Sequence, residues 1–204
     1  MSQSLKSKVL ARIYGRGRGW AFSKMDFGAE FSPEGAQRAL SRLAASGVIR
    51  RVMRGVYDYP PKGLSAGTYR SPDLHQVAQA LARKFSWRIQ PTGNAALNLL
   101  GLSNQVPGRW VYLSDGPARQ YTIGKQTLDF RKAPLKEAAL KTKEGALLVQ
   151  AIKALGKDRL DAEVMAKLSA YLKQQDCSRI LQDTKAVPEW IHNIIRKACE
   201  QSGG

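Results

Sequence analysis

Two arginines one helical turn apart are the residues of this sequence best suited to bind an anion. Arg38 and Arg42 stand four positions apart in FSPEGAQRALSRLAASG, and Gln37 and Ser41 directly precede them. At 100° per residue both arginines fall opposite Leu40, and like charges at this spacing repel mildly unless an anion lies between them. Arginine can pair bidentately with guanine and glutamine with adenine, while serine can bond a phosphate or a base. The pattern indicates DNA readout, with a solvated basic helix face as the alternative.

A second group of arginines follows in the segment VIRRVMRGVYDYP. Arg50, Arg51 and Arg54 crowd a predicted β-hairpin whose turn is Arg54-Gly55, and no acidic residue occurs in the segment before Asp58. Contact with DNA phosphates accounts well for this density of positive charge.

The run GRGRGW at residues 15–20 resembles neither a nucleotide-binding loop nor an arginine-glycine tail. Its glycine spacing is wrong for a phosphate loop, and no strand precedes it. The glycines are expected to end the first helix, with Trp20 and Phe22 anchoring the chain in the core. We expect Arg16 and Arg18 to reach phosphate, and a water-facing loop is the alternative.

Residues suited to catalysis are sparse. The two histidines, His75 and His192, lie far apart and have no metal-ligand spacing around them. Asp115, Asp129 and Glu144 could form a nuclease-like set of carboxylates, but no motif spacing supports it. The sequence therefore predicts no enzyme, no catalytic or metal-binding residue and no cofactor, with a nucleic-acid-processing enzyme as a weaker alternative.

Charge is the dominant property of the composition. The 204 residues include 33 Lys and Arg against 16 Asp and Glu, a net charge of +17 with a pI near 10.2. The excess is +8 in residues 1–62 (12 basic, 4 acidic), +6 in 63–134 (9 and 3) and +3 in 135–204 (12 and 9). Such a surplus points to nucleic acid first and to an anionic membrane second. No apolar run is long enough for a membrane span, no secretory signal is recognisable, and Cys177 and Cys199 suit a reducing cytosol, so a cytoplasmic protein is expected.

The expected elements form an α+β fold with two domains. Residues 1–62 predict a helix over 3–14, a short helix over 22–28, a helix from Ser32 to Gly47 and a hairpin over 48–59, which is the order of a winged helix-turn-helix. A connector over 59–72 leads to a mixed domain, residues 63–204. Its expected elements are a helix to Phe85, strands within 87–133, a short apolar helix at 92–102, and a helical tail over 134–204 with helices near 143–155, 161–175 and 188–200.

The residues that carry these elements also resemble a known family. RALSRLAASGVIRRVMRGVYDYP, followed by PTGNAALNLLGLSNQVPGRWVYLSDGPARQYTIGKQTLDFRKAP, is similar to the AbiEi antitoxins of bacterial type IV toxin–antitoxin (abortive-infection) systems. The resemblance covers roughly residues 5–135, and the helical tail carries no matching motif.

The resemblance implies a winged-helix domain that binds operator repeats and represses its own operon in phage defence. It also implies a C-terminal domain that counteracts a nucleotidyltransferase-type toxin, without showing whether the two proteins touch. The expected partners are double-stranded DNA, bound by a dimer or cooperatively, and functionally the toxin; no membrane partner is expected. The DNA-binding role falls on Gln37, Arg38, Ser41, Arg42, Arg50, Arg51 and Arg54, to which our reading of the glycine run adds Arg16 and Arg18. A mobile-element regulator without a toxin partner is the alternative that these residues cannot distinguish.

Overall fold

The computed structural model describes residues 5–28, 30–105, 107–133 and 140–203 and confirms the α+β fold. The chain divides into two compact units. The first contains residues 1–88 and 122–125, and the second contains residues 89–121 and 126–204. Residues 134–139, where the sequence predicts the start of the helical tail, lie outside the described residues.

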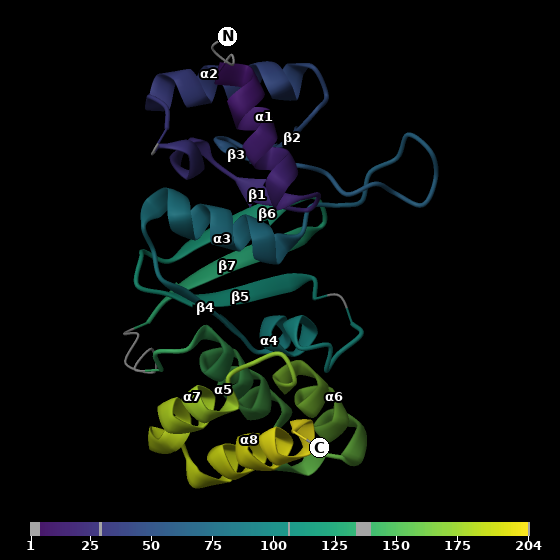
Figure 1. The fold of residues 1–204 in the computed structure, drawn as a ribbon, viewed down its shortest axis with the longest axis vertical. Coiled ribbons are helices and arrows are strands. Elements are labelled where there is room, and N and C mark those ends of the chain that lie inside the picture. The colour runs from purple at the N-terminus through teal and green to yellow at the C-terminus, as the bar shows by residue number, and fades with distance from the viewer. Residues whose placement is uncertain (1–4, 29, 106, 134–139, 204) are drawn as a thin grey trace. The chain divides into compact units, whose positions relative to one another are not determined.

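The first unit has the element order of a winged helix-turn-helix (Figure 1). Its elements are α1 (Leu5–Arg16), β1 (Ala21–Phe22), the 3-10 helix η1 (Lys24–Phe27), α2 (Pro33–Ala45), β2 (Arg50–Met53), β3 (Val56–Asp58) and α3 (Leu74–Phe85). The strands form one antiparallel sheet in the order β1-β3-β2. The predicted hairpin and its turn at Arg54-Gly55 are therefore confirmed.

The helix α2 begins where its sequence signals place it. The Ser32 hydroxyl accepts a hydrogen bond from Gly35 N at 3.1 Å, and Pro33 occupies the first helical position, where no backbone donor is needed. The inner face of α2 buries Leu40 completely, in one core with Ile13 of α1 and Phe22 of β1. Burial of such apolar side chains stabilises each by about 1.5–3 kcal/mol, which fixes the opposite face of α2 toward solvent.

The short helix expected over 22–28 is present only in part, as the 3-10 helix η1. Phe22 is extended and pairs with Tyr57 of β3, and only residues 24–27 turn, as a 3-10 helix. Ser23 caps this turn by accepting from Met25 N at 3.2 Å, while Asp26 accepts from Ser23 N at 2.8 Å. The extended conformation is favoured over a helix at Phe22 because it buries this side chain fully. The half-buried Trp20 ring lies 4.7 Å from the Phe22 ring.

The helix α3 belongs to the first unit. Arg83 donates from Nε to Asp26 Oδ1 at 2.5 Å and from Nη2 to Ala21 O at 2.8 Å, which ties α3 to η1 and β1. The sequence placed the domain boundary between residues 62 and 63, whereas this compact unit continues past the connector to Arg88.

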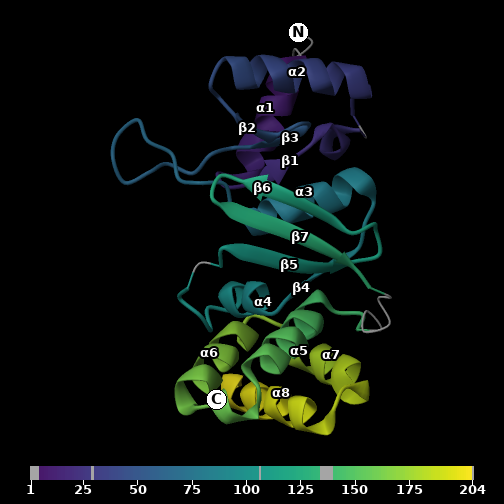
Figure 2. The same ribbon diagram turned by 180° about the vertical axis from the view of Figure 1, so that it is seen from behind.

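The second unit contains a four-stranded sheet (Figure 2). Its strands and first helix are β4 (Ile89–Thr92), α4 (Asn94–Leu99), β5 (Arg109–Ser114), β6 (Arg119–Ile123) and β7 (Gln126–Lys132), although the last two residues of β6 are counted with the first unit. The strand order is β4-β5-β7-β6, with β4 and β5 antiparallel and β5 and β7 parallel. Gly124 makes the turn from β6 to β7 with φ of +60°, a conformation that favours glycine.

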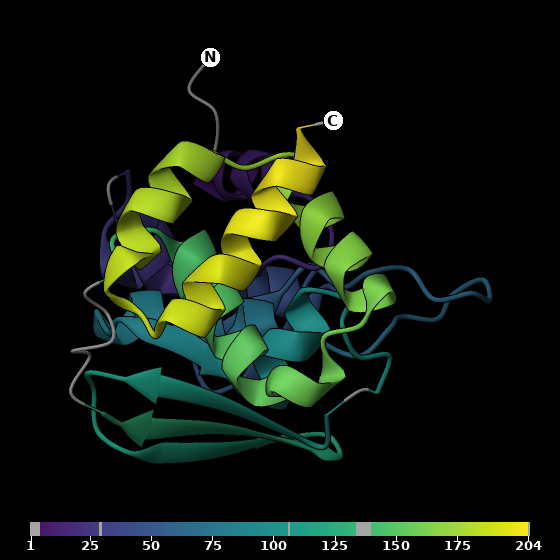
Figure 3. The same ribbon diagram turned by 90° about the horizontal axis from the view of Figure 1, so that it is seen from below.

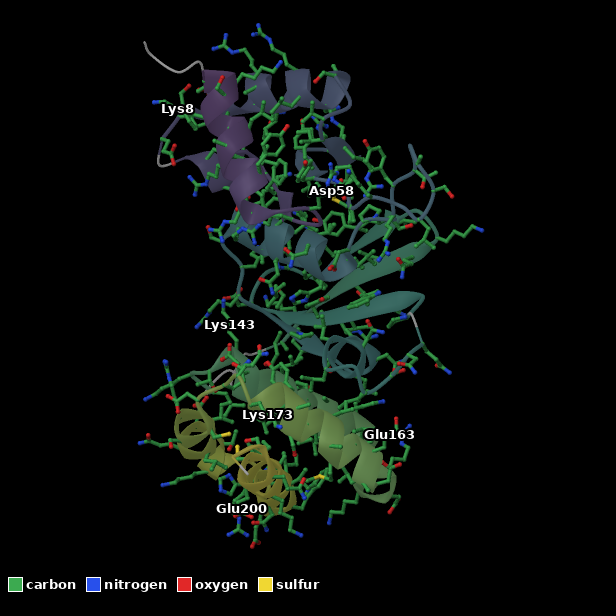
Figure 4. The ribbon with its side chains drawn as sticks, turned by 45° about the vertical axis from the view of Figure 1, so that its right-hand side comes forward. Lys8, Asp58, Lys143, Glu163, Lys173 and Glu200 are labelled. Carbon is green, nitrogen blue, oxygen red and sulfur yellow. The ribbon has the colours of Figure 1, made fainter. Side chains whose placement is uncertain are left out.

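A group of helices completes the second unit (Figure 3). They are α5 (Lys143–Leu155), α6 (Ala162–Leu172), α7 (Cys177–Asp183) and α8 (Glu189–Ser202), with the 3-10 turns η3 (Lys157–Arg159) and η4 (Thr184–Ala186). Leu148, Ile152, Leu168 and Ile195 are buried in one core with residues of α4. Charged side chains such as Lys173 and Glu200 lie on the solvent-exposed surface of these helices (Figure 4). The helix α7 was not predicted.

Candidate nucleic-acid interface

The outer face of α2 presents two unneutralised positive charges. Arg38 and Arg42 are both exposed, and within the described part of the chain neither guanidinium has a hydrogen bond or an ion pair. The only acidic residue of the helix is Glu34, in its first turn. Glu34 stands one turn before Arg38, but no ion pair joins the two in the residues that the structure describes, so an external anion is the ligand that would relieve the repulsion between Arg38 and Arg42.

A buried hydroxyl joins α2 to the hairpin. Tyr57 of β3 is fully buried, and its Oη accepts from Gln37 Nε2 at 3.0 Å and from Arg51 Nη2 at 3.1 Å. Gln37 Nε2 also lies 3.4 Å from Ser41 Oγ. The structure thus brings together Gln37, Ser41 and Arg51, which the sequence predicted to contact DNA. They gather around Tyr57, which the sequence did not predict as a site residue.

The pKa of Tyr57 lies below its usual value. Burial alone would raise it, but hydrogen bonds from Arg51, Ser41 and Gln37, together with the positive charge of Arg51, outweigh the burial and lower it. The Arg51 guanidinium also lies 5.5 Å from the Tyr57 ring centroid. The polar face of α2 is therefore held in register with the hairpin by an electrostatic contact as well as by packing.

The three hairpin arginines do not share one role. Arg50 donates to both Asp58 oxygens, at 3.0 and 2.5 Å, and to Arg70 O at 2.8 Å. Asp58 is 1% exposed and lies inside the first unit (Figure 4), so its charge needs this partner. Arg50 therefore stabilises the fold. Arg51 and the turn residue Arg54 are the two hairpin arginines that could bind an anion.

Further positive charge gathers behind the turn of the hairpin. Lys84 at the end of α3 donates to Arg54 O at 3.1 Å, and its ammonium lies against Gly55, whose φ is +76°. Burial lowers the pKa of Lys84, and the nearby charges of Lys24 and Arg54 lower it further. The sequence reasoning missed Lys84 because it assigned the helix to the other domain.

The arginines of the glycine run are held by aromatic rings. Arg18 donates from Nη1 to Pro60 O at 2.8 Å and lies 4.4 Å from the centroid of the Tyr59 ring. Arg16, the last residue of α1, is exposed and lies 5.8 Å from the Trp20 centroid. Arg18 therefore ties the loop to the chain after the hairpin, whereas Arg16 stays available to an anion.

The candidate catalytic carboxylates are not grouped as metal ligands in the part of the chain that the structure describes. Asp129 pairs with Arg109 at 2.5 Å and with Arg131 at 3.2 Å. Across the described ranges no three His, Cys, Asp or Glu side chains are grouped as a metal site requires. This covers Asp115 and Glu144, the other two members of the predicted set, as well as both histidines.

The cysteines are buried or half-buried thiols. Burial, with an added contribution from Cys177, raises the pKa of Cys199 to about 12, so this thiol stays protonated. No helix in the described ranges is both long and apolar enough to cross a membrane.

Comparisons with known proteins give one family match. A protein-family model described as a family of unknown function, DUF6088, matches residues 8–180. A search of curated proteins finds no match. Among solved structures, the crystal structure of the RV2827C protein from Mycobacterium tuberculosis is similar, with 16% sequence identity and a TM-score of 0.39 over all of this chain and 78% of that one.

Proposed function

We propose that this chain, which belongs to the DUF6088 family, is a sequence-specific DNA-binding protein that represses its own operon and serves as the antitoxin of a type IV toxin–antitoxin pair. The DNA-binding part rests on Arg38 and Arg42 of α2, which are exposed and have no partner among the described residues, together with the hairpin arginines Arg51 and Arg54. Its site of action would be the cytoplasm, where the DNA is.

The expected mode of binding follows from the element order. In a winged helix-turn-helix the helix equivalent to α2 enters the major groove, and the hairpin lies against the backbone. Arg38 and Arg42 would then meet base edges or phosphates, with Gln37 and Ser41 beside them. Arg51 and Arg54 would contact phosphates, which position the protein without reading sequence. Occupancy of the promoter by this unit would block transcription.

A gel-shift titration tests this part. The full chain is titrated with the DNA upstream of its own gene and with random duplex, and specific binding is expected to weaken steeply as salt rises. The Arg38→Ala, Arg42→Ala double variant should lose the preference for the upstream DNA. The matched control is Lys173→Ala with Lys185→Ala, which removes the same charge from the helical tail and should keep the preference. Equal loss of affinity for both DNAs would mean that α2 contacts only phosphate.

The antitoxin part rests on the resemblance to the AbiEi antitoxins alone. Its test is co-expression with a nucleotidyltransferase-like toxin from the neighbouring reading frame. Growth rescue by the full chain is expected, and rescue should persist in the Arg38→Ala, Arg42→Ala variant, because repression and neutralisation are then separate activities. DNA binding without any rescue would contradict the antitoxin role and leave a transcriptional regulator.

A further inference from the structure

The two cysteines of the chain meet in the second unit. Cys177 is the first residue of α7, and Cys199 lies in the last turn of α8. Their side chains share a hydrogen bond, although 22 positions separate them in the sequence. Since the chain has two cysteines in all, each thiol has the other as its one intramolecular partner for a disulfide.

The packing of α7 against α8 brings the two thiols together (Figure 1). Asp176 caps α7, so this helix begins at Cys177. One turn later, Ile180 is buried in the same core as Ile195 of α8. Ile195 precedes Cys199 by one turn. Because residues three or four positions apart share a helix face, both thiols lie on the faces that the two helices turn toward each other.

A hydroxyl of α8 holds the Cys177 side chain in place. Ser202 Oγ lies 3.7 Å from Cys177 Sγ and donates a hydrogen bond to Cys199 O at 2.7 Å. Cys177 therefore contacts both Cys199 and the residue one turn beyond it. The same hydroxyl is close enough to bond an oxygen atom added to the Cys177 sulfur.

The two thiols differ in their access to solvent. Cys177 is half-buried, whereas Cys199 is 8% exposed. Burial, together with the hydrogen bond to Cys177, raises the pKa of Cys199 to about 12, so Cys199 keeps its proton. A small oxidant therefore reaches Cys177 first, and Cys199 lies behind it as a protonated thiol that already touches the sulfur being oxidised.

We propose that peroxide converts Cys177 and Cys199 into a reversible disulfide that links α7 to α8. Hydrogen peroxide first oxidises the Cys177 thiol to a sulfenic acid: an S–O bond forms, the O–O bond breaks and one water leaves. The Cys199 sulfur then attacks the Cys177 sulfur, and the hydroxyl group departs with the Cys199 proton as a second water. The two thiols lose two electrons in total, and the peroxide gains them.

This inference is independent of the proposed DNA-binding function and adds an oxidised state to the second unit. In a reducing compartment the pair stays as thiols, and disulfides of cytosolic proteins are usually transient or redox-sensing. A disulfide that closes a loop of this length restricts the unfolded chain, so oxidation should raise the melting temperature of the second unit by about 5–10 °C. A thiol reductant should reverse the shift.

The test treats the full, reduced chain with hydrogen peroxide and maps its tryptic peptides without reduction. The peptide of residues 174–179 should become joined to that of residues 198–204, and dithiothreitol should separate them again. Thermal unfolding of the same samples should show the expected rise and its reversal. No DNA is used, so the result does not depend on whether the chain binds an operator.

Two matched variants separate the roles of the thiols, with circular dichroism as the check that each is folded. Cys199→Ser should stop the reaction at the Cys177 sulfenic acid, which dimedone labels, whereas the unaltered chain should take up little dimedone. Cys177→Ser should leave the buried Cys199 unoxidised while the chain stays folded.

Three results would overturn the proposal. The first is the absence of the joined peptides in the peroxide-treated, unaltered chain. The second is equal dimedone labelling of Cys177 in the unaltered chain and in Cys199→Ser. The third is a disulfide that joins two copies of the chain, seen as a dimer on a non-reducing gel.

Discussion

Removal of one hydroxyl, in Tyr57→Phe, should relax DNA sequence preference without removing any charge. Tyr57 Oη accepts the hydrogen bonds of Gln37 Nε2 and Arg51 Nη2, at 3.0 and 3.1 Å. The phenyl ring fills the same buried space, so the core should be preserved. Each lost hydrogen bond contributes about 0.5–1.5 kcal/mol net, and water can reach the half-buried Gln37 and the exposed Arg51. We expect the free energy of unfolding to fall by about 1–2 kcal/mol.

The effect on DNA follows from the freedom that Gln37 gains. A bidentate contact between a side chain and a base discriminates by about 1–3 kcal/mol. Partial loss of its orientation should cost about 1.4 kcal/mol, a tenfold fall in the ratio of affinities for upstream and random DNA. The salt slope should stay unchanged, because no cation is removed.

The assay is a competition titration at fixed salt with Tyr57→Phe, Gln37→Ala and the double variant. If Tyr57 acts by positioning Gln37, Tyr57→Phe should have little further effect on the ratio once Gln37 is alanine. An undiminished ratio in the single variant, or an equal additional loss in the Gln37→Ala background, would refute the positioning role.

Three further outcomes follow from the described contacts. Arg16→Ala should lower the salt slope by about 0.9, whereas Arg18→Ala should lower the melting temperature and leave the slope unchanged; a shared response would contradict their different surroundings. Because the pKa of Tyr57 is lowered in the folded state, its ionisation favours folding. Urea titrations should show the unaltered chain gaining stability over Tyr57→Phe as pH rises through the lowered folded pKa toward the ordinary value of 10.0, and losing that gain as pH falls again. Cys199, with its pKa near 12, should resist iodoacetamide at pH 8 until urea unfolds the chain, and rapid native labelling in a mass spectrum would contradict its burial.

The sequence predicted best those elements whose signals are local. Ser32 and Pro33 mark the start of α2, and the helix predicted over 143–155 is α5 with the same bounds. The two-residue strand β1 forms because Ala21 and Phe22 pair with Asp58 and Tyr57 of β3, and such partners cannot be read from a short segment. The helix α7, seven residues long, is too short for a clear apolar period.

The role of Arg50 could not be predicted, because it depends on a shift in strand register. A simple hairpin turning at Arg54-Gly55 would place Arg50 opposite Tyr59. An irregularity between Arg51 and Met53 shifts the pairing by one residue, so Arg50 instead faces Asp58. Sequence spacing therefore grouped Arg50 with the other hairpin arginines, although its charge is already neutralised inside the fold.

The same limit applies to the residues that the sequence reasoning missed. Tyr57 was taken only as a residue of the returning strand, because its contact with Gln37 spans twenty positions. Lys84 joins the basic surface only because α3 packs on the first unit. Residue type and spacing identified the basic surface, but its internal partners required the tertiary structure.

The central claim is that the first unit reads a DNA sequence through α2. The most direct measurement is the affinity of the full chain for its own upstream DNA and for random duplex, each followed over 50 to 300 mM salt. We predict a preference for the upstream DNA of about a thousandfold or more, as for other specific DNA-binding proteins, with both affinities falling linearly on a log–log plot. Equal affinities for the two DNAs at every salt concentration would contradict the claim.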